Sequence, residues 1–522
     1  MRAIAKGKGA VAAGHAETAA AAQVILEEGG NAFDAVLAAM IAACLAEPVL
    51  ASMGGGGFMV ARPATGKTGV YDFFAHTPKA HPAPDMRDFY PVTCDFGAAR
   101  QQFHVGMASI AVPGAVKGLF EISRDLGRMP IKRIVEPALV LARDGIPVTP
   151  VQASIFKIAE KIYLSSAESR AIFASATDAS RIIGAGEIMT NVAFADVLEA
   201  IAIEGDDLFY RGEIAERIAG DCYRGGGTVT RRDLESYEVC RRHPLNCTYK
   251  GTRIVTNPPP SSGGVLVAFA LAMLEEMDMQ RLVPGHSGYI SLLAKVMDLT
   301  NRARIEQGIH ELEEHQTEQT LLDPQLLESY RQEVMGQPAF HRGTTHISVI
   351  DRFGNAAALT LSNGEGAGYV VPGTGIMLNN MLGEEDINPH GFHQWPTDTR
   401  LSSMMAPAIV QDADGGTMVL GSGGSNRIRT AILQVLLNVL EFGMPLAAAI
   451  ASPRIHFEGG LLNVEGGFDP DARQEFAGGF ADVRSWDDKN MFFGGVHGVR
   501  VDRSGTYWAA GDERRGGAAV VL

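Results

Sequence analysis

A glycine and two threonines head a run of alternating apolar and polar residues over 343–351, and this feature constrains the fold most strongly. The alternation predicts a β-strand at 345–351, and a turn at Asp351 followed by a second apolar run predicts its hairpin partner at 356–362. A threonine hydroxyl becomes nucleophilic when a base takes its proton, and the residue's own α-amino group is such a base once the preceding peptide bond is cut. The sequence therefore predicts a hidden N-terminus at Thr344, at the tip of a buried strand. The alternative is an ordinary hairpin with two surface threonines.

Bulk composition is that of a globular chain with no visible division into domains. The 522 residues are 46% hydrophobic and 20% charged, and no Pro/Ser-rich linker, charge block or low-complexity tract interrupts them. A net charge of −15 argues against nucleic acid or an anionic membrane as a partner, because both bind basic patches. The longest apolar stretch, 35–45, is too short to span a bilayer and predicts a buried helix. We therefore expect one large intertwined unit that acts on a small molecule.

The N-terminal residues and the cysteines bear on the compartment. Residues 1–9 lack an uninterrupted apolar segment followed by a cleavage site, which argues against a secretory signal. The five cysteines are odd in number and lack paired metal-type spacing, as is typical of a reducing compartment. These features predict a cytoplasmic protein, with a periplasmic protein already trimmed of its signal as the alternative.

Periodicity divides the chain into a helical first half and a second half richer in strands. Apolar residues at helical spacing predict helices at 17–28, 35–45, 115–126, 134–144, 194–202, 265–277, 289–305 and 432–441. Alternating or continuous apolar runs predict strands at 58–62, 69–74, 253–255, 345–351, 356–362, 417–420 and 496–502. Asn31 is expected to cap the second helix.

The sequence lacks complete motifs for zinc binding, phosphate binding or α/β-hydrolase catalysis. His310 and His315 are five residues apart and cannot share a helix face as a zinc-binding pair does. The segment 65–68 resembles the end of a phosphate-binding loop, but it connects strand-like runs instead of opening a helix. No G-x-S-x-G elbow surrounds Ser422, which counts against an α/β-hydrolase. The sequence predicts neither a metal nor a cofactor.

Seven short segments occur in a fixed order along the chain. They are 29–35 (Gly-Gly-Asn-Ala-Phe-Asp-Ala), 54–59 (Gly-Gly-Gly-Gly-Phe-Met), 112–115 (Val-Pro-Gly-Ala), 258–264 (Pro-Pro-Pro-Ser-Ser-Gly-Gly), 344–346 (Thr-Thr-His), 401–404 (Leu-Ser-Ser-Met) and 421–425 (Gly-Ser-Gly-Gly-Ser). In this order, and at roughly this spacing, they resemble the γ-glutamyltransferase family of N-terminal-nucleophile hydrolases over nearly the whole chain. The resemblance implies an α+β fold, a four-layer αββα sandwich in which two stacked, mainly antiparallel sheets lie between helix layers.

The resemblance also implies maturation by self-cleavage. A cut between Gly343 and Thr344 would give a large, helix-rich fragment (1–343) and a small catalytic fragment (344–522). Because the two fragments would share sheets, we expect them to stay associated as one structural unit.

Four residues match the catalytic groups of the family. Thr344 matches the nucleophile, and Ser362 matches a second hydroxyl on the neighbouring strand, where relatives carry threonine. Gly423 and Gly424 match the glycines whose backbone N–H groups stabilise the oxyanion of acyl transfer. Thr345 and Asn363 are further polar groups expected near the substrate.

Substrate recognition is where the chain departs from the family pattern. Relatives hold the glutamate α-carboxylate with an arginine, and Phe74 occupies that position here, although the two assisting serines remain as Ser402 and Ser403. Relatives read the α-amino group with polar residues at positions that hold Met381 and Glu384 in this chain. An aromatic and an apolar residue in place of an ionic clamp imply a different acyl group.

A carboxylated substrate nevertheless stays open, because other cations lie in the sequence near these motifs. Candidates for a relocated cation are Arg62, Arg342 and Arg400. The segment 385–400, which would lie over the site, is shorter than in many relatives and carries His390, His393 and Trp395.

These features predict an autoprocessing amidohydrolase or acyltransferase that attacks a small amide or acyl substrate through a threonyl ester, with water as the acceptor. One alternative is a true γ-glutamyl hydrolase or transpeptidase that acts on glutathione-like donors through a rearranged clamp. An acylase for dicarboxylic side chains and an oxamate-type amidase also fit the superfamily. A non-catalytic binding or scaffold relative is the alternative from another class. The expected partners are the substrate and the other fragment of the same precursor, with a homodimer left open.

Overall fold

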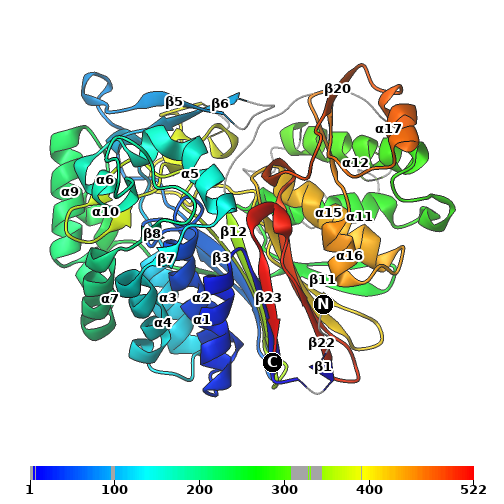
Figure 1. The fold of residues 1–522 in the computed structure, drawn as a ribbon, viewed down its shortest axis with the longest axis horizontal. Helices are drawn as coiled ribbons and strands as arrows, with labels where there is room; N and C mark the ends of the chain where they lie inside the picture. Colours follow the sequence, from blue (N-terminus) through cyan, green and yellow to red (C-terminus); the bar gives the residue numbers. More distant parts are fainter. Residues whose placement is uncertain are drawn as a thin grey trace.

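The computed structural model describes residues 4–5, 7–95, 100–306, 327, 330, 344–388 and 391–522. Within this part of the chain, two seven-stranded sheets stack face to face, and helices cover the outer face of each (Figure 1). All strand pairings inside these two sheets are antiparallel. The arrangement is the four-layer αββα sandwich that the resemblance implied.

The first sheet interleaves strands that precede residue 343 with strands that follow it. Its order is β23 (Ala518–Val521), β2 (Gly9–Ala13), β12 (Thr345–Asp351), β13 (Ala356–Ser362), β3 (Gly56–Arg62), β4 (Gly69–Phe73) and β9 (Cys240–Arg242). The second sheet runs β1 (Ile4–Ala5), β22 (Thr506–Ala510), β21 (Gly495–Val501), β17 (Thr417–Gly423), β16 (Ala408–Gln411), β11 (Thr252–Thr256) and β10 (Leu245–Tyr249). Strand β12 thus pairs with β2 from the N-terminal region and with β13 from its own hairpin.

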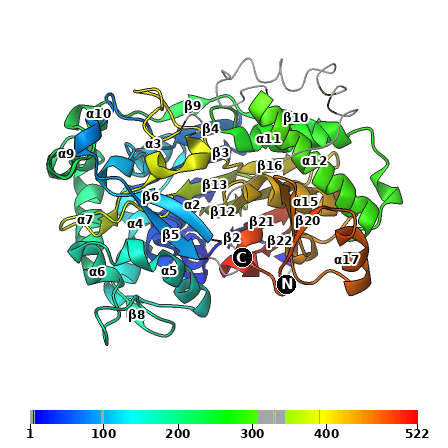
Figure 2. The same ribbon diagram turned by 90° about the horizontal axis from the view of Figure 1, so that it is seen from above.

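Two groups of helices form the outer layers, and the view from above in Figure 2 places them on opposite sides of the strands. On the side of the first sheet lie α1 (Ala16–Glu27), α2 (Ala32–Ala46), α3 (Ala115–Leu126), α4 (Ile131–Asp144), α5 (Pro150–Tyr163), α6 (Ala167–Phe173), α7 (Val192–Glu204), α8 (Asp207–Tyr210), α9 (Glu213–Gly225) and α10 (Arg231–Glu235). On the side of the second sheet lie α11 (Ser262–Leu274), α12 (Ser287–Glu306), α15 (Arg427–Leu440), α16 (Leu446–Ala451) and α17 (Pro470–Ala477). Smaller sheets join β5 (Tyr90–Asp95) to β6 (Arg100–Val105), β7 (Ile146–Pro147) to β8 (Ile188–Met189), β14 (Val370–Val371) to β15 (Ile376–Met377), and β18 (Ile455–Glu458) to β19 (Leu461–Val464) and β20 (Asp482–Ser485).

The buried helix α2 is held in place at its N-terminus by side chains. Asn31 accepts hydrogen bonds from the backbone of Phe33 and Asp34, and Asp34 accepts one from the Asn31 N–H, so the predicted cap is a capping box. Asp351 Oδ2 also accepts from the N–H of Ala32 at 2.9 Å. Its Oδ1 accepts from the backbone of Phe353 and of Asn355, which confirms the predicted turn at Asp351. One carboxylate therefore fixes the β12–β13 turn to the start of α2.

The predicted elements all occur, and the structure adds others. The helix predicted at 432–441 begins earlier, at Arg427, because it follows directly from the end of β17. The sequence analysis missed α5, although Thr149 and Gln152 form a capping box at its start, a pattern visible in the sequence. It also missed short strands such as β16 and β23, each of four residues, which are too brief to show a clear alternation.

Candidate active site

Thr344 lies at the head of β12, opposite the second hydroxyl that the sequence analysis singled out. Thr345 pairs with Leu361, so the register continued by one residue sets Thr344 opposite Ser362. Directly opposed residues of an antiparallel pair point to the same face, with Cβ atoms about 5 Å apart. Ser362 in turn pairs with Gly56 of β3, and its Oγ accepts a hydrogen bond from the N–H of Gly364 at 3.0 Å. Thr344 and Ser362 are both buried, with 4% of each exposed.

The face of β12 that carries Thr344 packs directly on the second sheet. A Cβ added to Gly423 would overlap the carbonyl oxygen of Thr344, and one added to Gly421 would overlap the ring of His346. The two glycines of β17 therefore let the sheets approach more closely than larger residues would allow. The His346 ring is fully buried between Thr360 Oγ1 at 2.8 Å and Ser348 Oγ at 3.0 Å, and burial lowers its pKa well below the ordinary value.

The chain makes a sharp turn between β17 and α15 beside Thr344. Gly424 has a φ of +124°, a conformation that a glycine adopts without strain. Ser425 also has a positive φ, +51°, and Arg427 donates its N–H to the Gly424 carbonyl at 3.1 Å. The turn thus brings Gly423, Gly424 and the N-terminal end of α15 to the head of β12. Backbone N–H groups in such a place suit a developing oxyanion.

The opposite face of β12 carries Thr345, which binds a buried carboxylate. Thr345 Oγ1 donates to Glu47 Oε2 at 2.6 Å, and Thr18 Oγ1 donates to Glu47 Oε1 at 2.9 Å. Glu47 is the C-terminal cap residue of α2, and 6% of it is exposed. Burial raises its pKa from 4.5 to about 7, while hydrogen bonds from Thr345 and Thr18 and the charge of Arg515 act against that rise. The site thus contains an acid that titrates close to neutrality.

A buried arginine lies on the Thr344 backbone. Arg515 donates from one guanidinium nitrogen to the Thr344 carbonyl at 3.1 Å and from another to the Met491 carbonyl at 3.3 Å. Burial lowers its pKa to about 10, and the carboxylates of Asp512, Glu47 and Glu365 act against that shift. The guanidinium stays charged at neutral pH.

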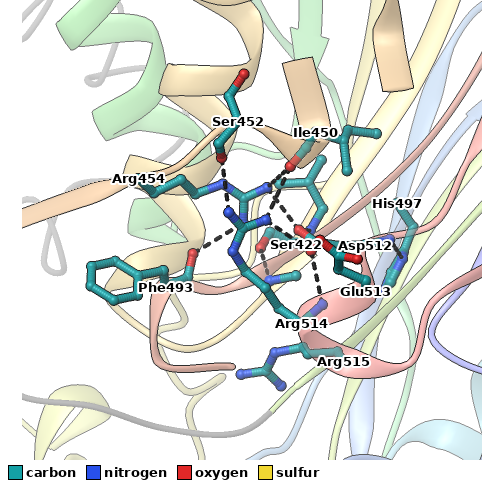
Figure 3. Close-up of polar contacts among 12 residues, drawn as sticks. Ser422, Ile450, Ser452, Arg454, Phe493, His497, Asp512, Glu513, Arg514 and Arg515 are labelled. Carbon is teal, nitrogen blue, oxygen red and sulfur yellow. Dashed lines mark hydrogen bonds and ion pairs between the residues drawn. The ribbon is translucent and has the colours of Figure 1, made fainter. Parts of the chain in front are cut away.

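An ion-pair cluster next to Arg515 fixes the short 3-10 helix Glu513–Arg515 (Figure 3). Asp512 binds Arg454 at 2.7 Å and Arg514 at 3.0 Å, and Arg514 also binds Glu465 at 2.6 Å. The backbone N–H of Asp512 donates to His497 Nδ1 at 3.2 Å, and burial lowers the pKa of that histidine to about 4. Because every partner is buried, the cluster fixes the backbone of the short helix that carries Arg515.

Phe74 and Met381 are buried in one apolar cluster. Gly57 pairs with Phe73, so the register sets Phe74 beside Gly56, in the same row across the sheet as Thr344 and Ser362. The Phe74 ring is 1% exposed and stacks on Phe58 with centroids 5.5 Å apart. Met381 is also 1% exposed and belongs to the same cluster. The positions of the family's ionic clamp are thus filled by packed apolar side chains.

The two serines remain close to this row. Leu401 donates its N–H to the Ala75 carbonyl at 3.1 Å, so 401–403 runs beside the end of β4. The Ser403 carbonyl accepts from the Ser262 N–H at 2.7 Å, and Ser402 Oγ lies 3.3 Å from Ser262 Oγ. Ser403 uses its own hydroxyl to accept from the Met405 N–H at 3.1 Å. Both the carbonyl and the hydroxyl of Ser403 therefore accept hydrogen bonds from backbone N–H groups in the described structure.

Asn363 and Glu384 lie on either side of the loop that follows Ser362. Asn363 is fully buried, and within the described part of the chain neither its Oδ1 nor its Nδ2 has a hydrogen-bond partner. A Cβ on Gly364 would overlap Glu384 Oε1, so Glu384 lies directly against the residue two positions beyond Ser362. An amide and a carboxylate thus lie near the hydroxyl pair.

Two of the three proposed replacement cations, Arg62 and Arg400, lie within the described residues, and neither is free near Thr344. The suggestion of Arg62 is wrong, because Arg62 pairs with Ala356 at the far end of β3, about 20 Å from Gly56 at the usual rise per residue. Arg400 lies beside Phe74, but its guanidinium binds the Tyr237 hydroxyl at 2.6 Å and the Glu238 carbonyl at 2.6 Å. It also contacts the Phe74 carbonyl and pairs with Asp72 at 3.4 Å, so its charge is already engaged. Gly343, Arg342 and His390 lie outside the described residues.

The sequence analysis missed Glu47 and Arg515. Glu47 closely follows the apolar stretch 35–45, and this charge at the end of a long hydrophobic segment was the available signal. Arg515 had no local signal, since it lies 171 residues from Thr344. Across the residues that the structure describes, no group of three or more His, Cys, Asp or Glu side chains is arranged to hold a metal ion. The helices in that same part of the chain are all too short or too polar to cross a membrane.

Known proteins are similar to this chain over the residues that build the site. The Gamma-glutamyltranspeptidase family model matches residues 18–522. The chain is 32% identical to the glutathione hydrolase proenzyme of Escherichia coli (strain K12), over 86% of this chain and 81% of that protein. It is 28% identical to the acylase ACY 1 proenzyme of Pseudomonas sp. (strain SE83), over 99% of this chain and 94% of that protein. The solved structure of a cephalosporin acylase from Bacillus halodurans superposes with a TM-score of 0.84 at 23% identity, covering 100% of this chain and 97% of that one.

Proposed function

Because the chain belongs to the γ-glutamyltranspeptidase family and is an N-terminal-nucleophile amidohydrolase or acyltransferase, we propose that Thr344 is its nucleophile. Cleavage of the bond between Gly343 and Thr344 would free the α-amino group that activates the hydroxyl. One observation carries this proposal: Thr344 is held between the Gly423 backbone and the Arg515 guanidinium, opposite Ser362. Since the chain is an enzyme, the alternative of a non-catalytic scaffold is set aside.

The reaction then proceeds in two acyl transfers. The Thr344 amine takes the hydroxyl proton as Oγ1 attacks the substrate carbonyl, and N–H groups of the Gly423–Gly424 turn stabilise the oxyanion. The amine leaving group departs with a proton, which leaves a threonyl ester. Water then attacks the ester, releases the acid and returns the proton to Thr344. We propose that Ser362 hydrogen-bonds the Thr344 hydroxyl through both steps, and the register that sets the two residues opposite each other supports this role.

The packed apolar side chains define the acyl group that we propose. A donor with a glutamate α-carboxylate and α-ammonium would lie against Phe74 and Met381, and neither can pair with a charge. We therefore favour a small amide or acyl donor that lacks the α-amino-acid head. A glutathione-like donor is the second candidate, favoured by the identity with a glutathione hydrolase proenzyme, by the retained Ser402 and by the acidic side chain of Glu384.

Mass spectrometry of the denatured protein tests the nucleophile. Two chains, 1–343 and 344–522, are expected, with Thr344 as the new N-terminus, and Thr344→Ala should leave a single chain. A new N-terminus at Thr345 would shift the assignment by one residue. An uncut chain with full amidase activity after long incubation would contradict the proposal.

A further inference from the structure

Two buried charges bind the two residues at the head of β12, one through the Thr344 carbonyl and the other through the Thr345 side chain. Arg515 donates to the carbonyl of Thr344 at 3.1 Å, and that carbonyl is half of the peptide unit. Glu47 accepts from the side chain of Thr345, the residue on the other half, at 2.6 Å. The nucleophile's own backbone is therefore clamped between a cation and an acid.

The acid side of the clamp depends on whether Glu47 is ionised. An ionised carboxylate accepts both hydroxyl hydrogen bonds that reach it, from Thr345 and from Thr18. A protonated carboxyl would have to donate its single proton to one of these hydroxyls and would no longer face Arg515 with an opposite charge. Protonation of Glu47 therefore loosens both halves of the clamp.

The groups that face Glu47 come from several elements. Thr18 belongs to α1, Thr345 to β12, Cys44 to α2 itself, and Arg515 to the 3-10 helix Glu513–Arg515. A cavity of about 20 Å³ lies among Glu47, Arg515 and His15, with room for one water molecule. His15 accepts from the Glu17 N–H at Nδ1, so its Nε2 carries the proton of the neutral ring, and burial lowers its pKa.

We propose that Glu47 is a positioning residue for the Thr344 nucleophile and that its ionised form is the active one. The proposal rests on Thr344 as the nucleophile. Because burial raises the pKa of Glu47 to about 7, turnover should fall as the pH drops through neutrality.

The test is the pH profile of kcat, from pH 5.5 to 9, for the processed wild type and for Glu47→Gln. Glutamine keeps the size of the side chain but mimics the protonated state at every pH. We expect its kcat at high pH to be about tenfold below that of the wild type, with KM within about twofold and no acid limb near pH 7. Glu441→Gln is the matched control, because Glu441 is a hydrogen-bonded carboxylate at the opposite end of α15 from Gly424, bound to Tyr249 and Lys250. It should keep the wild-type profile.

A second variant distinguishes the effect of Glu47 on the pH profile from that of the Thr344 amine, which also titrates between about pH 7 and 8. Thr18→Val removes a hydrogen bond that lowers the pKa of Glu47, so the acid limb should move to higher pH by a measurable fraction of a unit. The amine's pKa would not respond. A Glu47→Gln enzyme with the wild-type limb and rate, or a Thr18→Val enzyme with an unmoved limb, would overturn the proposal.

Mass spectrometry distinguishes failure of the Thr344 assignment from failure of the Glu47 role. Each variant is checked by denaturing mass spectrometry for the 344–522 fragment before its kinetics are measured. If the wild type lacks that fragment, the proposed function fails. If all variants carry it and the profiles do not differ, only the role of Glu47 fails.

Discussion

The guanidinium of Arg515 donates a hydrogen bond to the carbonyl oxygen of Thr344 at 3.1 Å, across 171 residues of sequence. The bond joins the 3-10 helix Glu513–Arg515 to the head of β12, so this helix positions the proposed nucleophile. When folding holds a reactive group in position, the entropic cost of orienting that group is met during folding and no longer adds to the reaction barrier. The acceptor is a backbone carbonyl, so the bond does not depend on the Thr344 side chain.

Gly423→Ala should reduce kcat by about a hundredfold, because the added Cβ would overlap the Thr344 carbonyl and displace it by roughly an ångström. Gly69→Ala is the control, since a Cβ there meets no atom within 4 Å. Circular dichroism and the mass of the small fragment establish folding and cleavage before the rates are compared. Unchanged turnover in a folded, cleaved Gly423→Ala enzyme would place the nucleophile elsewhere.

Asp512→Asn should destabilise the protein by about 3 kcal/mol, because it leaves the buried guanidinium groups of Arg454 and Arg514 without a shared counter-charge. The measurement is the free energy of unfolding in denaturant, or the shift of Tm if unfolding is irreversible. Asp412→Asn serves as the comparison, since the Arg500 side chain that it binds is 31% exposed and the loss there should be about 1 kcal/mol or less. Equal losses in the two variants would show that the Asp512 cluster contributes no more than a surface pair.

The wild-type enzyme should prefer donors without an α-amino-acid head. Loss of the cation from a buried carboxylate pair weakens such donors by roughly thirtyfold or more, so kcat/KM for γ-glutamyl anilide should trail that for glutaryl, succinyl, oxamyl or simple acyl anilides. Met381→Gln should recover part of the γ-glutamyl activity by accepting from the ammonium. Phe74→Arg is a poor test, because it would bury a second guanidinium beside Arg400. If γ-glutamyl anilide is the best donor of the panel, the glutathione-like alternative holds.

The stability of the wild type should fall between about pH 4.5 and 7 relative to Glu47→Gln, and then level off. Folding raises the pKa of Glu47 from 4.5 to about 7, so the folded state binds more protons than the unfolded state in this window and stability decreases as the pH rises through it. A shift of this size corresponds to about 3 kcal/mol at most. Tm values of the two proteins, measured at each pH, give the difference. A constant difference from pH 4.5 to 8 would mean that the pKa of Glu47 is the same in both states.

Local patterns in the sequence were enough for the hairpin and its neighbours. The alternation at 345–351 and 356–362 predicted β12 and β13, and Asn31 predicted the cap of α2. These elements follow from spacing along the chain, because side chains alternate across a strand and repeat every turn of a helix. The order of the short motifs predicted the family, and with it the sandwich.

Tertiary structure alone decided what surrounds Thr344. Glu47 lies 298 residues before Thr345, and in the sequence it ends an apolar helix like many other glutamates. Only the stacking of α2 on β12 buries its carboxylate, and only burial gives it a pKa near 7. Arg515 acquires its role in the same way, because the second sheet and its ion-pair cluster carry it to a carbonyl 171 residues away. The sequence shows that each residue is ionisable, but its burial and its partners, which set its pKa, depend on how the layers pack.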